Sequence, residues 1–250
     1  AAAKNGAKVI LAEDKPRFGG SLLNDEVTIG NKKGKDWADE TILELKAMSN
    51  VIVKKRSQVF GYYDHNMMVM IERTKDHLEK PNKHTPRQRL WYIRAKEVIL
   101  STGSLERPLV FGNNDRPGIM LASAAKEYLK TYGVLVGKKP IIFTNNDSVY
   151  DLAIEFKKNN LDPLVIDVRE NSESAIVKEA KNLNINIKFS HAIANTKGYK
   201  KVSSAIVGKL NKNKSNYENL ETFLCDCICV SGNWTPTVHL SSQSGNKLKY

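Results

Sequence analysis

The chain has 250 residues, of which 41% are hydrophobic and 8% aromatic, a composition typical of a globular protein with one large or two ordinary domains. No apolar run approaches the roughly 18 residues of a transmembrane helix, so we expect no membrane partner. The net charge of +12 would suit a nucleic-acid partner, but the lysines are scattered rather than clustered with aromatic residues, so we expect no nucleic acid either.

The first stretch of interest ends in a carboxylate. Residues 1–6 are typical of the last turn of a helix with a glycine C-cap, and residues 9–12 form a continuous apolar run that predicts a parallel strand, followed directly by Glu13. In a dinucleotide-binding βαβ unit, an acid at this place accepts hydrogen bonds from a ribose diol. The glycine-rich phosphate turn is expected about 20 residues earlier, before residue 1. We therefore interpret the chain as a fragment of a longer protein.

Two glycines follow this acid. Gly19 and Gly20 would let the backbone approach a pyrophosphate without obstruction by a Cβ, and an apolar Leu22-Leu23 pair then resumes packing. The alternative is structural, since any parallel α/β sheet can supply a strand that ends in an acid. The spacing E-x-x-x-x-x-G-G-x-L nevertheless resembles flavoproteins with two dinucleotide-binding domains.

The next elements continue this domain. Residues 36–48 have helical spacing that would bring Trp37, Thr41, Leu45 and Met48 to one face, and residues 51–53 form a second parallel strand. Residues 60–63, 67–73 and 89–94 predict an antiparallel meander, whose methionines we interpret as core rather than as a metal site. In the fold that the chain resembles, residues 57–59 lie by the adenine.

Residues 97–104 predict a buried strand that ends in Ser101-Thr102-Gly103. This ending resembles the strand at which these flavoproteins leave their first domain, and the small residues allow backbone to pass close to a dinucleotide. Residues 111–118 are rich in Gly, Asn, Asp and Pro, which indicates a domain crossing.

A second βαβ pattern follows. Helices are predicted over residues 123–132, 148–158 and 174–183, and strands over 140–143, 164–167 and 185–189. At the expected fingerprint, Thr144 and Asn146 replace two glycines and Val149 replaces a small residue. Their side chains should block a pyrophosphate, although Asp167 keeps the place of the acid. We therefore expect this second site to hold no dinucleotide.

The last third returns the chain to the first domain. Two strands over residues 192–197 and 201–209 precede a polar spacer at 211–219, and a strand over 223–231 ends at Gly232. Cys225, Cys227 and Cys229 alternate along that strand, so we expect them on one face as buried packing, in a reduced cytoplasmic protein without a metal site.

These elements predict an α/β fold with two Rossmann-like domains of the pyridine nucleotide-disulfide oxidoreductase type, the first discontinuous, and a small antiparallel β-meander. We place the first dinucleotide-binding domain at residues 1–112, the second Rossmann-like domain at 113–222, and the return to the first at 223–250. The fold and the motifs predict cofactor-binding residues and no catalytic ones: Glu13, Asp14, Arg17, Gly19, Gly20, Ser21, Leu22, Val59, Ser101, Thr102, Gly103, Gly232 and Asn233.

Three stretches, at residues 113–120, 143–148 and 231–240, closely resemble the alpha subunits of heterotetrameric sarcosine oxidases, and the resemblance spans essentially the whole chain. It implies that this stretch binds NAD and that beta, gamma and delta subunits are partners. It also implies FAD and FMN in the complex, one flavin held by the beta subunit, with another at the alpha/beta interface, and tetrahydrofolate as co-substrate of a C-terminal half. Such an enzyme oxidises sarcosine to glycine and reduces oxygen to hydrogen peroxide. The family often has glycine where this chain has Asn233.

Other functions stay open. Related alpha subunits of opine, proline or cyanide-forming dehydrogenases share the module, and the nucleotide is either NAD or FAD. A self-sufficient NAD(P)H-dependent flavin reductase would need a second glycine-rich turn and usually a redox cysteine pair, and the sequence contains neither.

Overall fold

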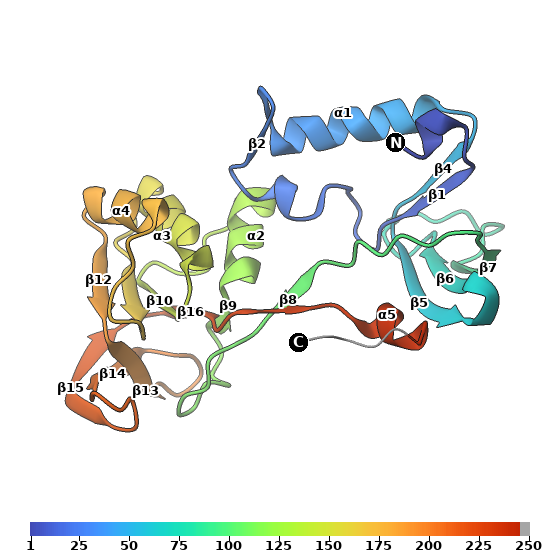
Figure 1. Cartoon of the computed structure of the whole chain (residues 1–250). Coiled ribbons are helices and arrows are strands. Elements are labelled where there is room, and N and C mark those ends of the chain that lie inside the picture. Colours follow the sequence, from blue (N-terminus) through green and yellow to red (C-terminus); the bar gives the residue numbers. More distant parts are fainter. Residues whose placement is uncertain (246–250) are drawn as a thin grey trace. The chain divides into compact units, whose positions relative to one another are not determined.

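The computed structural model describes residues 1–245, which divide into two compact units (Figure 1). Unit 1 contains residues 1–103 and the described residues from 236 onward, and unit 2 contains residues 104–235. Unit 1 is thus discontinuous in sequence, as expected. The chain leaves unit 1 after residue 103 rather than after 112, and it returns after residue 235 rather than after 222.

Two parallel strands form the centre of unit 1. The β-branched runs at residues 9–10 and 51–53 suit strands, and Val9 pairs with Val51 at the start of a continuous register. Neither strand is fully buried, since Ile10 is 42% and Ile52 is 49% exposed. A helix connects the two strands along the chain. The bounds are β1 (Val9–Ala12), α1 (Gly34–Ala47) and β4 (Val51–Lys54).

The buried face of α1 differs from the predicted one. Gly34 and Ala38 are its buried residues, whereas Trp37 is 40% exposed. Small residues face inward here because α1 lies close to the glycine turn: a Cβ on Gly19 would be only 3.2 Å from that of Ala38. Hydrophobic spacing alone could not reveal that small side chains would be favoured at this contact.

The meander of unit 1 confirms the predicted hairpin and third strand. β5, β6 and β7 are antiparallel neighbours, and Met68 and Met70 on the central strand are buried. A short hairpin, β2 and β3, precedes α1, and α5 begins at His239. The bounds are β2 (Thr28–Ile29), β3 (Lys32–Lys33), β5 (Ser57–Tyr63), β6 (Met67–Arg73), β7 (Gln88–Arg94) and α5 (His239–Gln243).

The strand predicted over residues 97–104 is wrong for most of its length. Residues 97–103 have no regular structure, and Ile99 is 84% exposed. An extended segment forms a strand only beside a neighbour that completes its hydrogen bonds, and in residues 1–245 the only partner of β1 is β4. Only β8 (Ser104–Glu106) forms, and it pairs with β17 (Trp234–Pro236) where the chain passes between the units.

Unit 2 is built on a five-stranded parallel sheet with the order β12-β11-β10-β16-β9 (Figure 1). The predicted strands and helices of the second βαβ pattern are all present. The bounds are β9 (Ile119–Leu121), α2 (Ala122–Tyr132), β10 (Pro140–Thr144), α3 (Tyr150–Lys158), β11 (Leu164–Asp167), α4 (Ala175–Asn182), β12 (Asn186–Phe189) and β16 (Cys227–Ser231).

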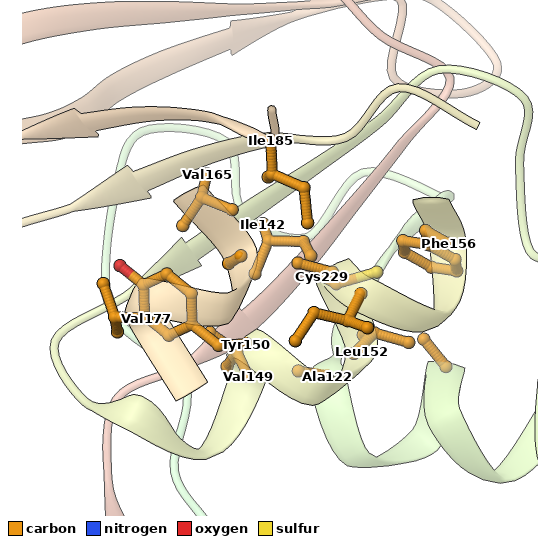
Figure 2. Packing of buried hydrophobic residues seen from close by; sticks show 14 residues of the cluster. Ala122, Ile142, Val149, Tyr150, Leu152, Phe156, Val165, Val177, Ile185 and Cys229 are labelled. Atoms are coloured by element: carbon orange, nitrogen blue, oxygen red, sulfur yellow. The ribbon is translucent and has the colours of Figure 1, made fainter. Parts of the chain in front are cut away.

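Both faces of this sheet are covered, which is why its strands are nearly continuous apolar runs. Figure 2 shows Tyr150, Leu152 and Phe156 of α3 packed against Ile142 and Cys229 of the sheet. On the other face, alternate strand residues pack against an antiparallel meander, in one cluster with Phe111. The meander consists of β13 (His191–Lys197), β14 (Ser204–Leu210) and β15 (Tyr217–Leu224).

Strand β15 was not predicted, because residues 211–219 were expected to be a polar spacer. Nearly all its side chains are exposed, and its sequence accordingly lacks an apolar alternation. Strand β16 pairs with β10 and β9, so residues 227–231 belong to the sheet of unit 2 rather than to the returning segment.

The expectation that all three cysteines share one strand face is wrong for Cys225, whereas Cys227 and Cys229 alternate along β16 as expected. Cys229 lies in the cluster beneath the helices, whereas Cys225 precedes β16 and packs in the cluster beneath the meander. All three thiols are free and buried, and burial raises the pKa of Cys225 to about 12.

No helix within residues 1–245 is long and apolar enough to cross a bilayer.

Candidate dinucleotide site

The carboxyl end of β1 fixes the backbone of Glu13 from two sides. Its N–H donates to Lys54 O at 2.9 Å, and its carbonyl accepts from Ser57 N at 2.8 Å. The Glu13 side chain accepts a hydrogen bond from Lys15 N at 3.0 Å. The carboxylate is therefore held at the end of the parallel strands, and a carboxylate offers about four acceptor positions.

The electrostatics of Glu13 oppose its ionisation. Burial raises the pKa of the Glu13 carboxyl above its ordinary value, and the adjacent Asp14 adds to the rise, while the hydrogen bond from Lys15 N lowers it. A raised pKa next to a second acid indicates a group that gains from a hydrogen-bond donor or a cation brought by a ligand.

Gly19 and Gly20 differ in what surrounds them. A Cβ on Gly19 would lie 3.0 Å from Leu23 Cδ2, and its φ of +125° is one that other residues rarely adopt. Gly20 has φ +54°, but a Cβ there would meet nothing within 4 Å. Packing explains Gly19, whereas Gly20 presents backbone toward open space.

The neighbours of this turn connect it to α1. Arg17 reaches the carboxylate of Asp39 on α1, with an Nη2 to Oδ2 distance of 3.0 Å. Leu22 packs beside Gly34, where an added Cβ would approach Leu22 Cδ2 to 3.0 Å. Asp14 and Ser21 are exposed. The loop after β1 is thus anchored to the helix that follows it.

Val59 and residues 101–103 also belong to unit 1. Val59 lies on β5, two residues after Ser57, whose N–H bonds Glu13, and it pairs with Met70. The Thr102 hydroxyl donates to Thr237 O at 2.7 Å, and Thr237 N donates to Gly103 O at 2.9 Å. Ser101, Thr102 and Gly103 are exposed at this junction.

Gly232 and Asn233 belong to unit 2, and local packing explains the glycine. A Cβ on Gly232 would lie 2.9 Å from Pro108 O. Asn233 has φ +110°, its carbonyl accepts from Arg107 N at 2.8 Å, and its side chain accepts from Trp234 N at 2.8 Å. The conformation at Asn233 is one that favours glycine.

Sequence reasoning missed Arg56. It has φ +54°, its N–H donates to Lys15 O at 3.0 Å, and its buried Nε has no hydrogen-bond partner among the described residues. An unsatisfied buried donor beside the Glu13 loop is a candidate for contact with a ligand acceptor. The only sequence signal was a basic residue just after a strand end.

Within residues 1–245, no group of three or more His, Cys, Asp or Glu side chains could hold a metal.

Comparison with solved structures supports the fold. Thioredoxin reductase from T. acidophilum matches 99% of this chain and 76% of its own with a TM-score of 0.71 at 17% identity. L-proline dehydrogenase from P. horikoshii matches 99% of this chain and 42% of its own with a TM-score of 0.66 at 18% identity. These neighbours confirm the two-domain Rossmann-like α/β class.

No family model matches the chain. Among curated proteins, the alpha subunit of sarcosine oxidase from Rhizobium meliloti (strain 1021) is 38% identical over 98% of this chain and 24% of its own length. Its counterpart from Corynebacterium sp. (strain U-96) is 37% identical over all of this chain and 26% of its own length. The A subunit of opine oxidase from Agrobacterium tumefaciens (strain Ach5) is 25% identical over 61% of this chain and 32% of its own length.

The chain thus spans about a quarter of the length of the sarcosine oxidase subunits that it matches, and these relatives are oxidoreductases. The resemblance inferred from three short stretches of sequence is confirmed along the whole chain. By its sequence, the chain belongs to the family of sarcosine oxidase alpha subunits.

Proposed function

We propose that unit 1 binds the adenosine half of NAD, as the cofactor-holding module of a sarcosine oxidase complex. The observation that carries the proposal is Glu13, a partly buried carboxylate fixed at the end of β1 with acceptor capacity for a ribose diol. Gly20 would offer unobstructed backbone to the pyrophosphate, and Val59 would contact the adenine. Ser101, Thr102 and Gly103 would line the same site.

The module holds a nucleotide rather than performing the oxidation, and we assign no catalytic residue to it. In the proposed complex, sarcosine and oxygen are converted to glycine and hydrogen peroxide at a flavin, and the one-carbon unit passes to tetrahydrofolate. FAD, FMN and the beta, gamma and delta subunits belong to this proposal, as does a cytoplasmic location. The sarcosine oxidase subunits matched by sequence support it.

An opine oxidase is the second candidate, because the A subunit of such an enzyme is also similar to this chain. A screen of the whole complex separates the two. Flavin reduction by sarcosine, and not by opines, proline or NADH, is expected. Fast reduction by an opine alone would favour the second candidate.

Nucleotide retention tests the role of Glu13. The whole protein is dialysed, its nucleotide is released by denaturation, and NAD and FAD are quantified by mass spectrometry. Glu13→Ala should weaken NAD binding by about 1.5–3 kcal/mol, roughly 10- to 150-fold, since it removes a hydrogen bond to a charged group. Glu79→Ala, at an exposed acid of the same unit, is the matched control and should retain NAD. Equal NAD content in both variants would refute the role of Glu13.

A further inference from the structure

Unit 2 repeats the architecture at which a dinucleotide binds. In an open α/β sheet, a dinucleotide lies across the carboxyl ends of adjacent parallel strands, over the turn that follows the first of them. In unit 2 this place is the turn at residues 144–149 after β10, next to Asp167 at the end of β11. We call this place the second crevice.

Two backbone N–H donors of the turn are already bound by its own side chains. The N–H of Asn146 donates to the Thr144 hydroxyl at 3.0 Å, and the N–H of Ser148 donates to the Asn146 side chain at 3.0 Å. The same side-chain oxygen accepts from the Ser148 hydroxyl at 2.6 Å. Backbone N–H groups in such a turn are what a pyrophosphate binds. Here the side chains of the turn take the place of the anion.

The acid of the second crevice is also fully engaged. Asp167 is 0% exposed, and its Oδ1 accepts from the backbone N and the Nε of Arg169, each at 3.0 Å. Its Oδ2 accepts from the Tyr150 hydroxyl and from Arg169 Nη2, each at 2.7 Å. A carboxylate offers about four acceptor positions. These four bonds leave none for a ribose diol.

Arg169 joins the two sides of the crevice. Besides Asp167, its Nη2 contacts Asp147 of the turn at 2.7 Å, and Ser172 donates to Asp147 at 3.1 Å. Burial alone would raise the pKa of Asp147, but the hydrogen bond from Arg169 and those from the nearby serines outweigh it and hold that pKa below its ordinary value. The guanidinium therefore bridges β11 and the turn where an adenosine ribose would lie.

The segment after β16 closes the other side. The indole Nε1 of Trp234 donates to the Ser148 hydroxyl at 3.1 Å, and Asn146 Nδ2 donates to Ser231 O at 3.3 Å. Asn145 Nδ2 adds a contact to Gly232 O at 3.4 Å. The turn is thus tied to residues more than 80 positions away in the sequence.

We propose that the second crevice is closed by side chains of unit 2 itself, with Arg169 in place of the ribose and Trp234 over the turn, so that unit 2 binds neither NAD(H) nor NADP(H). Unit 2 then keeps its fold without a cofactor, and the module holds at most one dinucleotide. This proposal goes beyond the one for unit 1 and stands whether or not unit 1 binds.

Hydrogen exchange with and without NADH or NADPH tests the closure, using the whole protein stripped of nucleotide. Peptides covering residues 144–149 and 167–174 should exchange at the same rate with and without either nucleotide, both in the unaltered protein and in Glu13→Ala, where NADH binding at unit 1 is weakened. New protection of these peptides by either nucleotide, in either protein, would overturn closure. Absence of NADH binding to any part of the protein would refute the proposed function while supporting closure.

A second variant tests whether Arg169 holds the crevice closed. Arg169→Lys keeps the positive charge but cannot make the forked contacts to Asp167, so exchange at the turn should rise by about tenfold. Arg89→Lys, an exposed position on β7, is the matched control and should leave exchange at the turn unchanged. Unchanged exchange in Arg169→Lys would contradict the role given to Arg169.

Discussion

Glu13 is the residue on which the proposed nucleotide site depends, and its charge should make binding there sensitive to pH. Because burial and Asp14 raise the pKa of Glu13, its carboxylate is fully present only above this raised value. A protonated carboxyl is a weaker acceptor for ribose hydroxyls than a carboxylate. We therefore expect NAD affinity to be highest above the raised pKa and to fall as the pH drops through it.

Titration of NAD binding by calorimetry between neutral pH and the acid limit of folding checks this expectation. Glu13→Gln should bind more weakly at neutral pH and should lack the acid step. An acid step of the same size in Glu13→Gln would assign the pH dependence to another group.

Substitutions at Gly19 and Gly20 should distinguish an effect on the free energy of unfolding from an effect on NAD binding. Gly19→Ala should lower the free energy of unfolding by about 2–4 kcal/mol, because both its φ and its contacts with Leu23 and Ala38 exclude a Cβ. Gly20→Ala should cost only about 1–2 kcal/mol, since its φ of +54° is left-handed but its surroundings are open. Thermal unfolding and NAD retention of each variant are the measurements.

Gly20→Ala should nonetheless reduce NAD affinity, because the added methyl group would project toward the proposed pyrophosphate. Full NAD retention in this folded variant would show that Gly20 does not face the nucleotide.

The position of Glu13 could be predicted from the sequence, because a strand end is a local property. The difference between Gly19 and Gly20 could not, since it depends on contact with α1.

At the scale of elements, a buried carboxylate supports the start of α2. Leu121 provides no side-chain cap there, but Glu106 of β8, which is 9% exposed, accepts from Ser123 N at 2.8 Å. Glu106→Ala should lower the free energy of unfolding of unit 2 by about 1–3 kcal/mol, since a partly buried N–H loses its acceptor. Glu106→Gln keeps an acceptor and should cost less. Chemical denaturation that finds no loss for Glu106→Ala would contradict this role.

Some helices and strands could be predicted from the sequence and others could not. The helices and strands of unit 2 from α2 to β12 were predicted because their cores are formed by locally periodic residues. Strand β15 was missed because it is exposed at an edge, and the strand at residues 97–103 was overpredicted because its apolar pattern says nothing about a pairing partner. Two contacts close the second crevice: one between Asp167 and Arg169, which are near in sequence, and one between Trp234 and Ser148. The second contact could not be predicted from the sequence, because its residues are 86 positions apart.

For the molecule as a whole, the net charge of +12 should be incidental to function. Binding to duplex DNA at physiological salt should be no tighter than the nonspecific range of about 10⁻⁴ to 10⁻⁶ M. A shift assay with two unrelated duplexes and a salt series measures this. A complex that is selective for one duplex would contradict the prediction.

Locating the adenine tests most directly whether unit 1, and not the similar α/β unit 2, holds the dinucleotide. The whole protein is loaded with a photoreactive azidoadenine analogue of NAD, irradiated and digested, and the labelled peptides are identified by mass spectrometry. Labelling should fall on unit 1, on the peptide that contains Val59, and excess NAD should suppress it. Labelling of residues 144–149 or 167–174 in unit 2, suppressed in the same way, would contradict the account.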